Sequence, residues 1–193
     1  KQGLYFGKLT WYASPADTVN LSAFVRRENN LSDIDSNATD SHGRTILTHQ
    51  DRYQFQWKHS AGDLYNTLNV SYDKATQSTP SVGTGPEYVL TGSAGSFSAL
   101  AVTGAHFFEQ GDNQKTITIK DDLTLRKGDH TIKVGAQASF MDLSRTVNNT
   151  FNGSYYFVTP GAAGTFNPTS NIPFAAKINI QPSPTLNAKD TQL

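Results

Sequence analysis

Apolar and polar side chains alternate along the first part of the chain with a period of two residues. Leu9 and Trp11 stand between polar or amphipathic neighbours, and the same alternation resumes at Val19 and Leu21 after the segment 14–18. This period is typical of a β-strand that has one apolar and one polar face. Proline and aspartate between two such runs favour a turn. Residues 4–28 are therefore predicted to form a β-hairpin.

The same pattern returns twice. Residues 52–74 carry Tyr53, Phe55 and Trp57 at alternate positions before a Ser-Ala-Gly-Asp turn, and residues 114–146 repeat the design around a Lys-Gly-Asp-His turn. No helical period is found. We therefore predict three hairpins with about six strands, each of the 9–11 residues that a tilted membrane strand needs.

The predicted connections differ greatly in length. The turns within the hairpins have about four or five residues, whereas the segments 29–50, 75–112 and 147–193 are long and rich in Gly, Ser, Asn and Pro. Short turns at one end and long extracellular loops at the other are typical of an outer-membrane barrel. In a compact soluble domain such loops would be unusual. The apolar run 97–108 is a candidate for an additional strand.

Aromatic side chains stand next to the short turns. Trp11 and Tyr12 precede the first turn, and Trp57 precedes the second. Trp and Tyr favour the membrane–water interface, where barrels carry aromatic girdles. Alternation alone also fits a soluble, secreted β-sandwich that binds carbohydrate, with these residues in its core. A small membrane barrel without transport is a third interpretation.

The amino-acid composition argues against several other classes of protein. Hydrophobic residues make up 36% of the 193 residues, below the roughly 45–50% of a soluble domain, and charged residues make up 17%. The 16 basic and 16 acidic side chains cancel, which argues against a nucleic-acid partner. Without cysteine there is no disulfide scaffold and no Cys-ligated zinc. No apolar stretch reaches the roughly 18 residues of a membrane helix. Residues 1–11 resemble a strand rather than a signal peptide.

An acidic run in the first long loop is the candidate cation site. Asp33, Asp35, Asn37 and Asp40 offer closely spaced oxygen ligands of the kind that Ca²⁺ prefers. The EF-hand loop also needs glycine at its sixth and glutamate at its twelfth position, where this chain has Ala38 and Arg44. A solvated acidic loop is the simpler interpretation.

Catalytic chemistry finds no support in the sequence. The five histidines (His42, His49, His59, His106 and His130) lack metal-ligand spacing, although His42 and His49 share one predicted loop. No G-x-S-x-G segment occurs, and Glu28, Glu87 and Glu109 have no evident carboxylate partner for glycoside hydrolysis. We expect no enzymatic activity, no cofactor, and neither catalytic nor metal-binding residues.

Many aromatic residues fall in the second long loop and in the tail. They could stack on a sugar or hold a peptide, or they could close the mouth of a barrel. The substrate-binding residues stay unknown from the sequence. The set comprises Tyr88, Phe97, Phe107, Phe108, Tyr155, Tyr156, Phe157, Phe166 and Phe174.

Residues 8–22, 119–137 and 150–157 together resemble segments of the barrels of TonB-dependent outer-membrane receptors, in particular the Oar-like group, whose barrels follow a carboxypeptidase-regulatory-like domain. Residues 119–137, IKDDLTLRKGDHTIKVGAQ, resemble that family's K-D-D-L-T-W…G-x-H-T-x-K-x-G hairpin, with Leu125 in place of its tryptophan. Residues 8–22, KLTWYASPADTVNLS, resemble another barrel hairpin. Residues 150–157, TFNGSYYF, resemble the F-x-G-x-F-x-F segment that follows the first pattern.

The resemblance implies part of the wall of a receptor that binds or imports a nutrient with energy from the TonB system. Six strands cannot close a barrel of about 22 strands, and no plug domain is seen, so the rest of the barrel, the plug and the lipid of the Gram-negative outer membrane are the expected partners. The residues expected to face lipid are Leu9, Leu21, Phe55, Leu68, Val70, Ile132 and Val134. Those expected to face the lumen are Arg26, Arg52, Gln54, Gln56, Lys58, Lys133 and Gln137. Asp121 falls in register with the lipid set, and we expect a β-bulge to rotate it inward.

Overall fold

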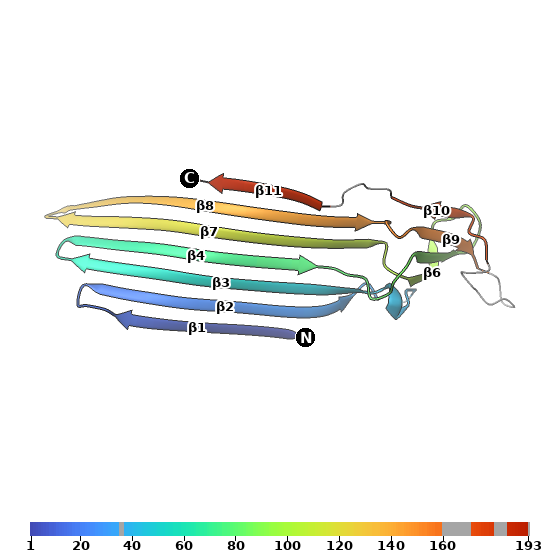
Figure 1. The fold of residues 1–193 in the computed structure, drawn as a ribbon, viewed down its shortest axis with the longest axis horizontal. Helices are drawn as coiled ribbons and strands as arrows, with labels where there is room; N and C mark the ends of the chain where they lie inside the picture. The colour runs from blue at the N-terminus through green and yellow to red at the C-terminus, as the bar shows by residue number, and fades with distance from the viewer. Residues whose placement is uncertain (35–36, 160–170, 180–184, 193) are drawn as a thin grey trace.

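The chain is all-β in the computed structural model, which describes residues 1–34, 37–159, 171–179 and 185–192. Besides one 3-10 turn, η1 (Asp40–His42), the elements are strands (Figure 1). In chain order they are β1 (Gln2–Tyr12), β2 (Asp17–Ser32), β3 (Arg44–Ala61), β4 (Leu64–Ser78), β5 (Glu87–Thr91), β6 (Ala99–Gly104), β7 (Phe108–Lys127), β8 (His130–Asn149), β9 (Ser154–Val158), β10 (Ala175–Lys177) and β11 (Thr185–Gln192).

Seven of the strands form one long antiparallel sheet. Its order is β1-β2-β3-β4-β7-β8-β11, so the three predicted hairpins lie side by side, and the three short turns meet at one end (Figure 1). The sheet does not close on itself, because β1 and β11 each have one neighbour among the described residues. It is thus an open segment of antiparallel wall, as the alternation predicts.

The long strands continue beyond the hairpins expected from the apolar pattern. β2 runs to Ser32 and β3 starts at Arg44, so half of the loop expected at 29–50 is paired strand. The backbone ladder needs no apolar side chains, and pairing therefore continues past the apolar part. The tail expected at 147–193 contains β9, β10 and an edge strand, β11, which makes the sheet seven-stranded instead of about six-stranded.

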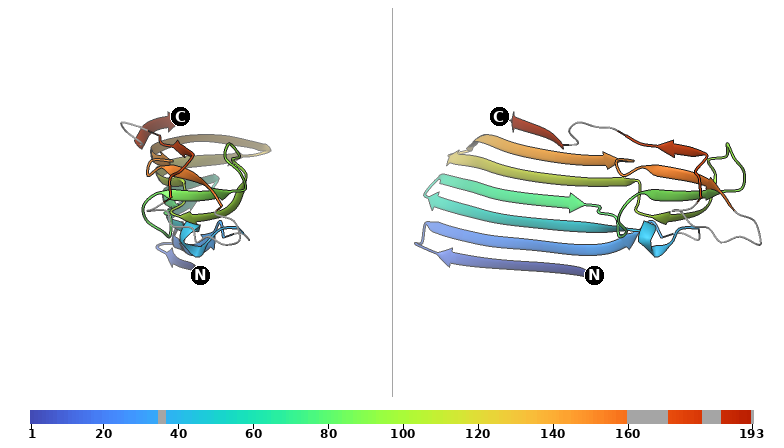
Figure 2. Two further views of the ribbon diagram at one scale, coloured as in Figure 1. Left: turned by 90° about the vertical axis from the view of Figure 1, so that its right-hand side faces the viewer. Right: turned by 45° about the vertical axis from the view of Figure 1, so that its right-hand side comes forward.

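A smaller sheet lies beyond the loop ends of the long strands (Figures 1 and 2). Its order is β10-β9-β5-β6, with β5 parallel to β9. We call it the loop sheet. Its core packs Val89, Val102 and Tyr156 together with Ala99 and Phe174. The predicted extra strand within 97–108 is present there as β6.

The buried apolar side chains of the described residues gather at this loop end. They are Val89, Val102, Ala105, Tyr156 and Phe157. On the long sheet, by contrast, Leu9 is 62% and Val134 65% exposed. The loop sheet lies past the strand ends and covers neither face of the long sheet (Figure 2). The described chain therefore lacks the two facing layers of a β-sandwich.

The expectation of a bulge at Asp121 is wrong. β7 keeps an unbroken register with both neighbours, and Asp121 lies directly between Leu68 and Ala136. Because side chains alternate strictly in an unbroken strand, Asp121 stays on the face of Ile119 and Leu123. No helix in the described part of the chain is long and apolar enough to span a membrane.

Candidate functional site

One face of the long sheet carries a continuous apolar band. Leu9, Leu21, Phe55, Val70 and Ile119 stand in register across five neighbouring strands. The next row towards the short turns has Trp11, Val19, Trp57 and Leu68. All seven residues predicted to face lipid lie on this face, because cross-strand partners share a face.

The band has the height of a membrane barrel's outer surface. Along β7 it runs from Ile117 to Leu125, and along β8 from Ile132 to Phe140, with Asp121 as the charged interruption. From the first to the ninth residue there are eight steps of about 3.4 Å, or roughly 27 Å along the strand. With strands tilted by about 40°, the band would be roughly 20 Å tall, close to the 25 Å or so of outer-membrane barrels.

Aromatic rings and then charges border the band on the loop side. Tyr53, Tyr72 and Phe140 occupy one row of the register. The following row is charged, with members Asp51, Lys74, Lys115, Asp142 and Lys189. This aromatic girdle was not predicted from the sequence. Its signal was a tyrosine at the end of an apolar run with a charged residue two positions further, as in Tyr53 and Asp51.

On the first three strands of the sheet, the turn-side border of the band matches the sequence prediction in part. Trp57 donates its indole N–H to Asp17 Oδ1 at 3.0 Å, and His59 Nδ1 lies 2.7 Å from the same oxygen. Trp57 thus has an apolar body and a polar end, as interface tryptophans do. Trp11 lies on the same face, but Tyr12 pairs with Thr18 and faces the opposite side.

The opposite face is polar and internally hydrogen-bonded. Thr10 donates to Asn20 (2.7 Å), Asn20 to Gln56 (3.2 Å) and Gln56 to Asn69 (2.8 Å), so one polar ladder crosses four strands. Elsewhere on this face Lys120 pairs with Asp122 at 2.7 Å. The register places all residues predicted to face the lumen on this side, namely Arg26, Arg52, Gln54, Gln56, Lys58, Lys133 and Gln137.

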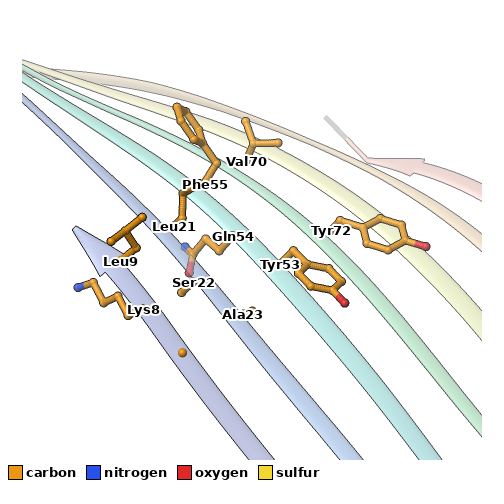
Figure 3. A pocket seen from close by; sticks show the side chains of 11 residues that line it. Lys8, Leu9, Leu21, Ser22, Ala23, Tyr53, Gln54, Phe55, Val70 and Tyr72 are labelled. Carbon is orange, nitrogen blue, oxygen red and sulfur yellow. The ribbon is translucent and has the colours of Figure 1, made fainter. Parts of the chain in front are cut away.

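A shallow groove of about 620 Å³ interrupts the apolar face (Figure 3). Gly7 and Ala23 pair with each other at its floor, where small side chains leave a depression. Leu9, Phe55 and Tyr53 rise beside it (Figure 3). The groove is open and apolar, and it belongs to the same surface as the band.

A buried polar cluster lies at the loop end, between the two sheets. His42 Nε2 is 3.7 Å from Glu87 Oε1, both side chains are buried, and the rings of His42 and His106 are 4.7 Å apart. Burial, reinforced by the nearby Arg44 charge, lowers the pKa of His106 below its ordinary value. The neutral ring is therefore favoured, and His106 Nδ1 accepts the Phe108 N–H at 3.0 Å.

The candidate cation ligands do not converge among the described residues. Asp33 is held by the Arg44 guanidinium at 2.6 Å, a hydrogen bond that lowers the pKa of this carboxyl. Asn37 donates instead to the Ala99 carbonyl at 3.4 Å, and Asp35 lies outside the described residues. The described part of the chain holds no group of three or more metal-ligating side chains. His49 stands in β3, apart from the cluster of His42.

Comparison with known proteins points to one fold. No family model matches the chain, and no curated protein matches it. Among solved structures, the outer membrane transporter YddB from Escherichia coli matches with a TM-score of 0.54 and 14% identity. The match covers 85% of this chain and 21% of that protein, so the chain spans about a fifth of the transporter's length. The described sheet therefore has the fold of an outer-membrane transporter segment.

Proposed function

We propose that this chain forms part of the wall of a TonB-dependent, Oar-like outer-membrane receptor that binds or takes up a nutrient. The observation that carries the proposal is the apolar band, about 27 Å long along β7, with an aromatic row and then a charged row at its loop-side border. In this arrangement the apolar face contacts lipid and the polar face lines the lumen.

The free energy of solvation favours that orientation. Each large apolar side chain moved out of water contributes on the order of 1.5–3 kcal/mol. Exposed members of the band include Leu9 (62%), Ile132 (57%) and Val134 (65%). The polar ladder on the other face prefers water or a polar plug, because amides without partners in hydrocarbon cost several kcal/mol.

The open edges require further strands. An unpaired strand edge is not tolerated in the hydrocarbon core, since each unsatisfied backbone group costs free energy there. β1 and β11 therefore need neighbours from the rest of the barrel. Residues 1–193 expressed alone are expected to aggregate in plain buffer, and a monodisperse monomer that melts cooperatively would contradict this.

The loop sheet would lie on the extracellular side, where receptors meet their ligands. Its position beyond the loop ends of the long strands, opposite the short turns, supports this orientation (Figure 1). The groove at Gly7 and Ala23 would face the outer leaflet and accommodate an acyl chain. No catalytic role is part of the proposal.

Membrane fractionation tests the proposal. The full-length protein should sediment with the outer membrane of a Gram-negative host and require detergent for extraction. Recovery in the soluble periplasmic or secreted fraction would overturn it and favour the β-sandwich. Dependence on TonB is tested separately. Nutrient uptake should stop when the inner-membrane energy supply is dissipated, and unchanged uptake would refute the dependence on TonB.

A further inference from the structure

A second cavity, of about 430 Å³, lies in the loop sheet. Its walls include the aromatic rings of Phe97, Phe107 and Tyr156, and its polar groups include Glu87, Ser154 and Lys177. Apolar walls with a few convergent polar groups are the usual composition of a small-molecule site. The volume is at the lower end of the roughly 300–1,000 Å³ of such sites.

One of the polar groups is a buried hydroxyl without a hydrogen-bond partner among the described residues, and another is a buried carboxylate. Ser154 has no exposed surface, and its Oγ is unpaired. Glu87 is 7% exposed, and its Oε1 lies 3.7 Å from His42 Nε2, which is longer than a hydrogen bond. A ligand that donates hydrogen bonds to the unpaired hydroxyl and to the buried carboxylate gains binding free energy.

The opposite charge stands at the mouth of the cavity. Lys177 is exposed, and its Nζ lies 5.3 Å from the ring centres of both Phe97 and Tyr156. Those two rings meet edge to face, with their centres 5.1 Å apart. A cation held over two rings stays available to an anionic group. The cavity therefore has a carboxylate inside, which can bind a positively charged group, and a cation at its rim.

We infer that this cavity binds a small zwitterion with an apolar body, namely a free dipeptide. Its ammonium group donates to Glu87 and Ser154, its side chain packs against Phe107 and Tyr156, and its carboxylate faces Lys177. This names a ligand class for the extracellular end of the proposed receptor, and in that respect it rests on the proposed function.

Titration calorimetry on the full-length protein in detergent tests the inference, with the probes Ala-Leu and Ala-Phe. Binding should weaken about tenfold or more when the probe is N-acetylated, and again when it is C-amidated, because each change removes a charge-assisted hydrogen bond. Failure of both free dipeptides to bind, or equal binding of their capped forms, would overturn the inference. So would binding of the uncharged disaccharide maltose in their place.

Three substitutions locate the site. Glu87→Gln and Lys177→Met should each weaken Ala-Phe binding about tenfold, whereas Glu28→Gln on the polar face of β2 should leave it unchanged. Ser154→Ala separates binding from folding: it removes a buried, unpaired hydroxyl, so the loop sheet should be at least as stable while Ala-Phe binding weakens. Unchanged binding in Ser154→Ala would remove this residue from the site and contradict the inference.

The outcome is independent of the membrane assignment. A soluble protein that binds Ala-Phe through Glu87 would refute the proposed function and retain the inference. An outer-membrane protein that binds neither dipeptide would do the reverse.

Discussion

An arginine in the middle of the apolar band is the sharpest perturbation of the proposed orientation. Val70 lies between Phe55 and Ile119, one row on the loop side of Leu68 and of Asp121, which is the middle of the band along β7. One row is two residues, or roughly 7 Å along the strand and about 5 Å in depth at a tilt near 40°. Val70→Arg should therefore cost about 2–3 kcal/mol, between the 2–4 kcal/mol or so of the midplane and the 0–1 kcal/mol or so of the interfaces.

The matched control is the next residue of the same strand. Ser71 lies on the polar face between Gln54 and Thr118, so Ser71→Arg should change the free energy of unfolding by less than about 0.5 kcal/mol. The measurement is equilibrium unfolding of the full-length protein in lipid vesicles by guanidinium chloride. Equal costs for the two variants, or a larger cost for Ser71→Arg, would refute the assignment of the faces.

Three further outcomes are expected. Gln56→Leu should lower the free energy of unfolding by about 1–2 kcal/mol, because two hydrogen bonds of the polar ladder are lost, while Gln54→Leu on the same strand should lower it less. Equal losses in the two variants would show that the ladder does not stabilise the sheet. Gly104 has φ +84° and its added Cβ would lie 2.2 Å from the Pro86 carbonyl oxygen, so Gly104→Ala should destabilise the loop sheet by more than about 1 kcal/mol, seen as faster hydrogen exchange there and not in the long sheet. His106 has a lowered folded-state pKa, so its contribution to the free energy of unfolding should be complete above the unfolded-state pKa near 6.5. That contribution should decline as the pH falls from there towards the folded-state pKa. Hydrogen exchange of the loop sheet, measured at pH 7.5 and 5.5, should show this pH dependence, and His106→Gln should abolish it.

The faces of the long strands were predictable because alternation is a local property. Each side chain of β3 from Tyr53 to Lys58 lies on the face that its position in the alternation assigns. The tight turns were predictable for the same reason, since Gly62 and Gly128 both have positive φ, which turn residues need. The prediction of a bulge at Asp121 was wrong because it assumed that a charged side chain must leave an apolar face. Two unbroken ladders of backbone hydrogen bonds hold this strand in register.

The loop end was beyond such local reasoning. β5 pairs in parallel with β9, and more than sixty residues separate Glu87 from its partner Ser154. Parallel pairing at that distance leaves no trace in the local alternation. The cluster of His42, Glu87 and His106 depends on this packing, and the spacing of these residues along the chain does not predict it. β11 was missed because its sequence is mostly polar, as an exposed edge strand permits.

Site-directed spin labelling along β3 tests the membrane orientation most directly. The chain contains no cysteine, so single cysteines can replace each residue from 52 to 58 for labelling in the full-length protein in lipid. Contact with dissolved oxygen should be highest at Tyr53, Phe55 and Trp57, and contact with a water-soluble nickel complex highest at positions 52, 54 and 56. The two profiles should thus alternate out of phase. In-phase profiles, or access of the nickel complex to every position, would contradict a wall that has lipid on one face and water on the other.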